Sequence, residues 1–391
     1  MSAVVDARSA GTDPRPRLLI MAWSTLRSDA RVLRQIRLFS GRYAVTTLGY
    51  GEAPDGVVEH LRLPDGVVHW HKDRRLLIQR RFEAAYRDAP VTHAATELLA
   101  GQPRFVVVIA NDIDTLPLAL DLAPTGGVHA DLHEYHPRQS EESWRWRTFV
   151  APYYRFLVRR YGPLADSVTT VGEGIAREYR LRFGLRAGVV VNAPQHVDLA
   201  PRPVEPGAPL RLVHSGNAQR HRLDVILEAM DLTTGPMTLD LYLMPNDEAY
   251  LAQLTERYAG SEQVRIHPPV APHELPATLN AHDVGVYVLP PVSFNHLWAL
   301  PNKIFDFVQG RLALVVGPSP EMAALVRRHG LGLVSPDFTA QGLADTLDAF
   351  TAEQVAGFKA ASDAAAVELS AEQQVRGWER AVDTLAARVG G

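Results

Sequence analysis

The stretch VGVYVLPPVSFNHLWALPNKIFDFVQGRLALVVGPSPEMAALVRRHGLGL, residues 284–333, decides the fold of this chain. Short apolar runs at 284–289 and 312–316 alternate with segments of helical periodicity that begin after Pro301 and at Pro320. This alternation predicts a parallel α/β layer, in which ligands bind outside the carboxyl ends of the strands. The loop before Lys303 is therefore expected to lie at a ligand site.

The helix that follows Pro301 has the features of an anion site. Proline suits the first position of a helix, because its missing N–H would have no partner there. Asn302 and Lys303 then fall in the first turn, where free backbone N–H groups and the helix dipole favour an anion. Lysine occurs elsewhere only at Lys72 and Lys359, so its presence in this turn stands out.

The strings LPNKIFDF, RLALVV and PSPEMAALVRRHGLGL together resemble the donor-binding segment of family-4-type retaining glycosyltransferases, which have the GT-B fold. In that family a Glu-x7-Glu pattern leads into the helix, and its second Glu holds the ribose of a nucleotide sugar. Alignment on the following strand puts Asp306 in the second Glu's place and Trp298 in the first's. The resemblance implies that Asp306 and Asn302 contact the donor ribose or sugar. Glu321 is a further donor-side candidate, although a Glu in a first turn also stabilises its own helix.

Length and composition limit the classes of protein. The 391 residues suffice for two domains, and a net charge of −4 gives no overall attraction to nucleic acid. The absence of cysteine excludes disulfides, thiolate metal sites and cysteine nucleophiles. Residues 1–17 lack the apolar region of a signal peptide, and no apolar run reaches the roughly 18 residues that a membrane span needs. We therefore expect a cytoplasmic protein with no nucleic-acid partner.

The first half of the chain predicts a Rossmann-like domain over 17–197, after a disordered tail at 1–16. Its expected strands are 18–22, 44–48, 105–110, 128–132, the SVTT run at 167–170, and 188–192. The loop after the first strand has no glycine, so the dinucleotide fingerprint is missing, which argues against a nicotinamide or flavin enzyme. Ser28 or Asp29 is placed to cap the helix that follows.

Polar clusters follow two neighbouring strands at residues 111–114 (NDID) and 131–134 (DLHE). An α/β enzyme puts its chemistry at such strand ends. NDIDTLPLAL and DLHE also resemble the glycosyltransferase family, in which this His lies at the acceptor side of the donor sugar. The resemblance implies that His133 and Glu134 are the catalytic candidates. A neutral His133 could accept a hydrogen bond from a sugar hydroxyl; the alternative is that it only packs locally.

Four residues are acceptor-side candidates: Ser24, Arg31, Asn111 and Asp112. Arg31 belongs to a D-x-R-V string (29–32) that the family commonly carries. The alternative for Arg31 is a solvated arginine on a helix surface. Asp131 is interpreted as mostly structural.

A proline-rich linker at 193–209 leads to a second Rossmann-like domain over 205–370, which opens with LRLVHSGNAQRHRLDVILEAM. Its glycine loop can cradle a diphosphate through backbone amides and arginines. The diphosphate candidates are Gly216, Asn217, Arg220, Arg222 and, from the opposite loop, Lys303. The family usually has Arg directly after the loop glycine, where this chain has Asn217, and only Arg220 falls in the family's register.

Two helical segments complete the organisation. Residues 142–161 are rich in arginine and aromatic residues. Such a basic amphipathic helix can lie on an anionic membrane surface, or it can pack on its own sheet with its arginines pointing outward. The final helix, in 371–391, is expected to cross back to the first domain, as the family's does.

We therefore predict an α/β protein of GT-B fold that moves a sugar from a nucleoside-diphosphate sugar, with UDP or GDP, to an acceptor hydroxyl with retention. The resemblance implies no metal and no cofactor, and the acceptor is a glycan, a glycolipid or a small molecule. Two alternatives remain: a nucleotide-sugar epimerase of the same fold, and a non-catalytic nucleotide-sugar-binding partner subunit. The loss of the first Glu keeps the second alternative open.

Overall fold

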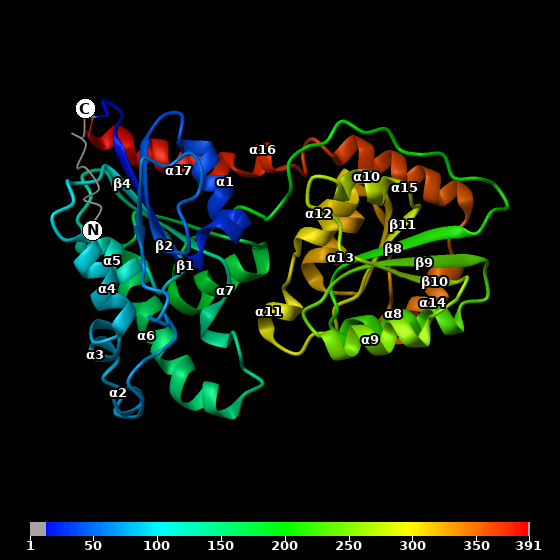
Figure 1. Cartoon of the computed structure of the whole chain (residues 1–391), viewed down its shortest axis with the longest axis horizontal. Helices are drawn as coiled ribbons and strands as arrows, with labels where there is room; N and C mark the ends of the chain where they lie inside the picture. The colour runs from blue at the N-terminus through cyan, green and yellow to red at the C-terminus, as the bar shows by residue number, and fades with distance from the viewer. Residues whose placement is uncertain (1–12, 390–391) are drawn as a thin grey trace, which may run out of the picture.

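The computed structural model describes residues 13–389 and contains two parallel α/β layers (Figure 1). The strands of the first sheet are β1 (Arg17–Thr25), β2 (Ala44–Tyr50), β3 (Glu59–Arg62), β4 (Val107–Asn111), β5 (Gly127–Leu132), β6 (Ser167–Thr170) and β7 (Gly188–Val189). Their order is β3-β2-β1-β4-β5-β6-β7, so the order reverses between β1 and β4. A ligand crevice is expected where a parallel sheet reverses its strand order.

The second sheet repeats this plan. Its strands are β8 (Leu210–Asn217), β9 (Met237–Met244), β10 (Val264–His267), β11 (Val284–Tyr287), β12 (Ala313–Val316) and β13 (Gly332–Val334). They lie in the order β10-β9-β8-β11-β12-β13, which reverses between β8 and β11. β8 and β11 therefore flank the second crevice, and the glycine loop follows β8.

Helices cover both sheets. In the first half they are α1 (Ala30–Phe39), α2 (Arg74–Ile78), α3 (Phe82–Arg87), α4 (Pro90–Leu99), α5 (Leu116–Asp121), α6 (Ala151–Tyr161) and α7 (Glu173–Phe183), with the short turns η1 (Leu26–Ser28), η2 (His136–Arg138), η3 (Trp146–Val150) and η4 (Gly162–Leu164). In the second half they are α8 (Arg220–Leu232), α9 (Glu248–Arg257), α10 (Leu275–Asn280), α11 (Phe294–Leu297), α12 (Asn302–Gln309), α13 (Pro320–His329), α14 (Ala340–Asp348) and α15 (Ala352–Ala365). The terminal elements are α16 (Ala371–Gln374), α17 (Arg376–Ala386) and η5 (Ala387–Val389).

The predicted strands are confirmed, and α12 begins directly after Pro301 as expected. Asp29 is the residue that caps α1, because its carboxylate accepts from the N–H groups of Arg31 and Val32. Residues 72–99 form three helices, α2, α3 and α4, because Arg80 takes a positive φ of 55° between the first two and Pro90 begins the third. The short elements β3, β13 and α11 were not predicted. The expected tail at 1–16 lies mostly outside the described residues.

The return of the C-terminal helix to the first domain is confirmed (Figure 1, red). Trp378, Val382 and Leu385 of α17 are buried in one hydrophobic core with residues of β1 and β4, such as Leu18 and Ile109. Truncating a buried Trp costs about 3–5 kcal/mol, so this contact ties the end of the chain firmly to the first domain. Within residues 13–389, no helix combines the length and the apolar composition that a membrane crossing requires.

Candidate functional site

The catalytic candidates lie where β4 and β5 end. The backbone N–H of His133 donates to Asp112 Oδ1 at 2.8 Å, and its ring Nε2 lies 3.0 Å from Asn111 Oδ1. Its Nδ1 lies 3.5 Å from Asp112 Oδ2. Asp112 has a φ of 67°, an uncommon conformation for a residue with a side chain. The structure thus brings three of the predicted residues into contact at one sheet edge.

Both ring nitrogens of His133 face oxygen atoms. Burial disfavours the charged imidazolium, but the carboxylates of Asp112 and Asp131 outweigh burial, so the pKa of His133 is raised above its ordinary value. The geometry therefore favours a protonated ring that donates hydrogen bonds. It does not favour the neutral, accepting imidazole that the sequence suggested.

Arg31 is buried, so the alternative of a solvated surface arginine is wrong. It is 3% exposed, and it donates to both carboxylate oxygens of the fully buried Asp131 at 2.8 and 2.6 Å. Its Nη1 also donates to the carbonyl of Val190 at 2.8 Å. Asp131 accepts further from Gln35 and Thr169, in agreement with its structural interpretation. Arg31 therefore holds the end of β5 in place and has few donors left for an acceptor.

A cavity of about 480 Å³ joins these residues to the second domain. Its lining includes Ser24, Arg31 and His133 of the first domain and Asn302 at the start of α12. Ser24 Oγ donates to Asp29 Oδ2 at 2.7 Å. Four predicted site residues from distant parts of the sequence thus share one cavity between the two sheets.

Arg34 also lines this cavity and was missed by the sequence analysis. Its Nη2 donates to Asn192 Oδ1 at 2.7 Å. Burial, together with the positive charges of Arg31 and Arg37, lowers the pKa of Arg34 to about 10. Its position one helical turn after Arg31 is the signal that could have identified it.

Lys303 lies beside the glycine loop, as the diphosphate prediction requires. A Cβ on Gly216 would lie 3.3 Å from Lys303 Cε, and Gly216 has a φ of 146°, so a side chain there would be strained as well as crowded. Lys303 Nζ lies 3.4 Å from Asp306 Oδ2. Burial raises the pKa of Asp306, and the charge of Lys303 counteracts this effect only in part. The end of β8, where Asn217 is exposed, therefore faces the start of α12.

The two arginines of α8 point to different places. Arg220 donates to Gln253 at 3.0 Å, and its guanidinium lies 4.3 Å from the ring centre of Tyr250 on α9. Arg222 lies 4.8 Å from the ring centre of Tyr287, at the end of β11. In this structure Arg222 is therefore turned toward the β8–β11 crevice, whereas Arg220 is engaged by α9.

His214, on β8 two residues before Gly216, is a second residue that sequence reasoning missed. Its Nδ1 donates to the carbonyl of Val286 at 2.9 Å, and its ring stacks on Tyr287. Burial lowers the pKa of His214 to about 4, so its Nε2 is a free acceptor at neutral pH. Among the described residues, His214 Nε2, Ser215 Oγ and Arg222 Nε are buried without a hydrogen-bond partner. Such orphaned groups around one loop are suited to a polar ligand.

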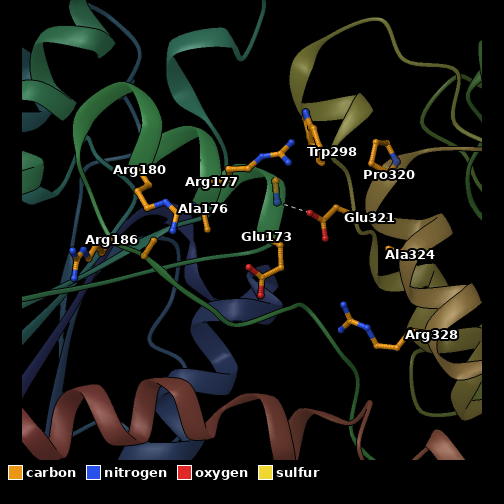
Figure 2. Close-up of a pocket in the computed structure, with 12 residues that line it drawn as sticks. Glu173, Ala176, Arg177, Arg180, Arg186, Trp298, Pro320, Glu321, Ala324 and Arg328 are labelled. Atoms are coloured by element: carbon orange, nitrogen blue, oxygen red, sulfur yellow. Dashed lines mark hydrogen bonds between the residues drawn. The ribbon is translucent and has the colours of Figure 1, made fainter.

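Glu321 and Trp298 do not face this loop; they contact the first domain (Figure 2). Glu321 Oε1 accepts from the N–H of Gly174 at 2.5 Å, at the start of α7. The indole of Trp298 covers Gly174, and the guanidinium of Arg177 lies 4.7 Å from its ring centre. These residues border a second cavity of about 600 Å³ between α7 and α13. The donor-side candidate Glu321 is thus engaged as a cap on α7.

Further contacts fix α11, which lies in the segment before α12, to the first domain. Asn295 Oδ1 accepts from the N–H of Tyr135 at 3.1 Å, and Asn295 Nδ2 donates to Glu134 Oε2 at 3.3 Å. Burial raises the pKa of Glu134. Phe294 is buried in the core of the first domain. The catalytic candidate Glu134 therefore contacts the donor-side loop directly.

No protein-family model matches this sequence, and no curated protein matches it. Solved structures do match. Sucrose-phosphate synthase from Thermosynechococcus elongatus is 12% identical, with a TM-score of 0.70 over 95% of this chain and 100% of that chain. HepE from Anabaena, in complex with UDP-glucose, is 12% identical with a TM-score of 0.64 over 95% and 99% of the two chains. Trehalose-6-phosphate from E. coli, described as bound with UDP-2-fluoro glucose, is also 12% identical, with a TM-score of 0.66 over 95% and 99%.

This chain has the GT-B fold. At 12% identity the similarity concerns the fold, and it extends over nearly the whole chain. The two reversals of strand order in a GT-B protein face one cleft, and here they bring the cavity at His133 and Asn302 close to the loop of Gly216 and Lys303.

Proposed function

We propose that this protein transfers a sugar from a nucleoside-diphosphate sugar to an acceptor hydroxyl, with retention of configuration and without a metal. The observation that carries the proposal is the position of Lys303 beside Gly216, which puts a cation and the start of α12 against the loop after β8. A helix start and a lysine together favour a diphosphate. GT-B structures that resemble this one hold UDP-glucose or a UDP-glucose analogue.

The proposed roles combine the geometry of the cleft with what the resemblance to retaining glycosyltransferases implies. Lys303, Arg222 and the amides of the glycine loop stabilise the negative charge that develops on the departing diphosphate, which is the main catalytic contribution. Asp306 lies on the same helix as Lys303 and holds the ribose. His133, at the cleft, orients the transferred sugar. The donor phosphate then serves as the base toward the acceptor hydroxyl, as the resemblance to retaining glycosyltransferases implies.

One observation favours a second candidate, a non-catalytic nucleotide-sugar-binding subunit. Trp298 replaces the family's first Glu, and its side chain is directed to Gly174 rather than toward a donor. Such a subunit would bind donor and never consume it. The epimerase alternative would convert donor in the absence of any acceptor, so product analysis distinguishes it.

The test begins with a thermal-shift screen of the full chain against nucleoside diphosphates and their sugars. Hydrolysis and transfer of the best donor are then compared for the wild type, Lys303→Ala and the control Arg327→Ala, which removes an exposed charge from α13. We expect Lys303→Ala to weaken donor binding roughly 10–100-fold, as for the loss of one charged hydrogen bond of about 1.5–3 kcal/mol. The proposal is overturned if wild type and Lys303→Ala bind the donor equally well and neither protein consumes it.

The proposed setting is the cytoplasm, with a glycan, a glycolipid or a small molecule as acceptor and peripheral membrane contact through residues 142–161. The structure bears on which side chains of this segment could make that contact. Trp146 stacks on the half-buried Tyr154, and Tyr153 is buried in the core, so these aromatic side chains are already packed against the protein. Trp144 is exposed at 60%. A membrane contact here would depend mainly on arginines.

A further inference from the structure

Five arginines surround a groove of about 730 Å³ on the first domain. They are Arg80, Arg147, Arg155, Arg159 and Arg160, and the groove between them is lined by Phe82, Thr148, Pro152 and Phe156. No carboxylate lines it. We call this feature the arginine groove.

Two stretches of sequence build the arginine groove. Residues 74–81 contain four arginines, residues 144–161 contain five, and neither stretch contains Asp or Glu. Packing of α2 against η3 brings the stretches together, and the rings of Phe82 and Phe156 lie 5.7 Å apart. A chain with a net charge of −4 thus concentrates positive charge at one place.

The charge of the groove is not neutralised by the protein. Within residues 13–389, none of its five arginines forms an ion pair with a carboxylate. Glu83, whose charge reaches Arg160, is already bound by Arg87 at 2.9 Å and by the hydroxyl of Tyr161 at 2.6 Å. Arg147 donates to the backbone carbonyl of Glu141 at 2.6 Å, so its charge also remains uncompensated.

The arrangement of side chains indicates the chemistry of the ligand. All five arginines are exposed, whereas Tyr153 of the same segment is buried and Trp146 stacks on Tyr154. The groove therefore presents guanidinium groups without carboxylates, which suits it to anions. A guanidinium binds phosphate oxygens in a bidentate manner, and several guanidinium groups around one groove select multiply charged phosphates.

We infer that the arginine groove binds phosphate groups, either of phospholipid headgroups or of a soluble phosphate-bearing molecule. α6 connects the groove to the cleft: Arg155 points to the groove, while the hydroxyl of its neighbour Tyr154 donates to Asp114 at 3.1 Å and its ring lies 5.1 Å from that of His136. Along the chain, α6 follows β5 after η2 and η3, and His133 stands immediately after the last residue of β5. A phosphate-bearing acceptor or carrier held in the groove would thus lie near the proposed acceptor side. This inference deepens the proposed membrane contact, but phosphate binding itself does not require glycosyl transfer.

The experiment uses the full chain in two binding assays. Flotation compares vesicles of phosphatidylcholine alone with vesicles that also contain phosphatidylglycerol, and thermal shift measures binding of inorganic phosphate and pyrophosphate. The groove variant is Arg155→Ala/Arg159→Ala/Arg160→Ala. The control is Arg180→Ala/Arg186→Ala/Arg328→Ala, which removes three exposed arginines around the other cavity. Substitutions at exposed positions of this kind change stability little. A parallel variant with Gln in place of each of the three groove arginines shows whether a loss of binding comes from the lost charge or from local unfolding.

We expect the groove variant to lose at least tenfold in affinity while the control keeps wild-type binding. Flotation only with the anionic vesicles identifies headgroups as the source, and a shift with pyrophosphate identifies a soluble ligand. Added salt should weaken either interaction, since the arginines are exposed. The inference is overturned if the wild type binds neither probe, or if groove variant and control bind equally. Binding of nucleotide sugar by the groove variant is measured separately, so that failure of the groove and failure of the proposed transferase site are distinguished.

Discussion

The indole of Trp298 lies directly against the α-carbon of Gly174, so closely that a Cβ at residue 174 would be 1.9 Å from Trp298 Cε3. Trp298 belongs to the loop before α12, and Gly174 belongs to the first turn of α7 on the other domain. Only glycine admits this approach. Glu321 accepts from the N–H of the same glycine, so a single residue receives two contacts from the second domain.

We therefore predict that Gly174→Ala separates the loop of Trp298 from α7. An added methyl group in a packed contact typically costs about 1–3 kcal/mol, because side chains or backbone must shift. The free energy of unfolding by urea should fall by that amount, and small-angle scattering should show a larger radius of gyration. The matched control is Gly174→Ala in a Trp298→Ala background, where the clash is absent. Equal costs of Gly174→Ala in both backgrounds would contradict the contact.

The buried pair of Arg31 and Asp131 gives the second prediction. Arg31→Ala leaves the Asp131 carboxylate buried without its main cation, and the expected loss of stability is roughly 3–5 kcal/mol. Arg37→Ala, on an exposed position of the same helix, should change stability by no more than about 0.5 kcal/mol. Chemical denaturation of both variants checks this. A small effect of Arg31→Ala would show that solvent reaches Asp131.

The third prediction concerns pH. Because the folded-state pKa of His133 is raised above its unfolded value, protonation of His133 stabilises the fold fully below the unfolded pKa of about 6.5. This contribution is lost as pH rises through the folded pKa. The difference in unfolding free energy between wild type and His133→Gln should therefore shrink from acid toward alkaline pH. Urea unfolding of both proteins across that range measures it.

Two other histidines provide the internal comparison for that titration. Burial lowers the pKa values of His129 and His214 to about 4. In an NMR titration their ring signals should change only well below pH 6, whereas the signal of His133 should change above 6.5. If all three titrate together, the carboxylates around His133 do not act on it as the structure indicates.

The fourth prediction separates the two arginines of α8. Arg222 faces the crevice beside Tyr287, whereas Arg220 is held by Tyr250 and Gln253. Arg222→Ala should weaken donor binding roughly tenfold or more, as for one charged hydrogen bond of about 1.5–3 kcal/mol, and Arg220→Ala should have a smaller effect. Calorimetry with the best nucleotide sugar measures both. The reverse order would support the register of the family motif over the observed side-chain positions.

Periodicity along the chain was enough to predict most of the fold. Buried strands such as β4 and β12 are continuous apolar runs, and Pro301 and Asp29 mark helix starts through local backbone chemistry. These features depend on neighbours in sequence. β3 (EHLR) escaped prediction because it has no continuous apolar run, and β13 (GLV) because it has only three residues; their pairing with β2 and β12 decides them.

In the candidate site, too, some features follow from the sequence and others from the tertiary structure. Strand ends and a helix start located His133, Asn111 and Lys303 from the sequence alone, since the carboxyl ends of parallel strands must share an edge. Which side chains are free at that edge depended on the tertiary structure. Arg31 is hydrogen-bonded to Asp131, Glu321 to the N–H of Gly174, and Arg220 to Gln253 of α9. These partners lie up to 147 residues apart and meet only after folding.

The sequence by itself thus determined the elements, the two α/β halves and the strand ends at which a ligand would bind. Tertiary structure decided the directions of the charged side chains, the protonation that His133 favours and the contact of Trp298 with the other domain. The physical reason is range: backbone propensity and hydrophobic periodicity act over a few residues, whereas burial and charge pairing depend on groups that only the folded chain brings together.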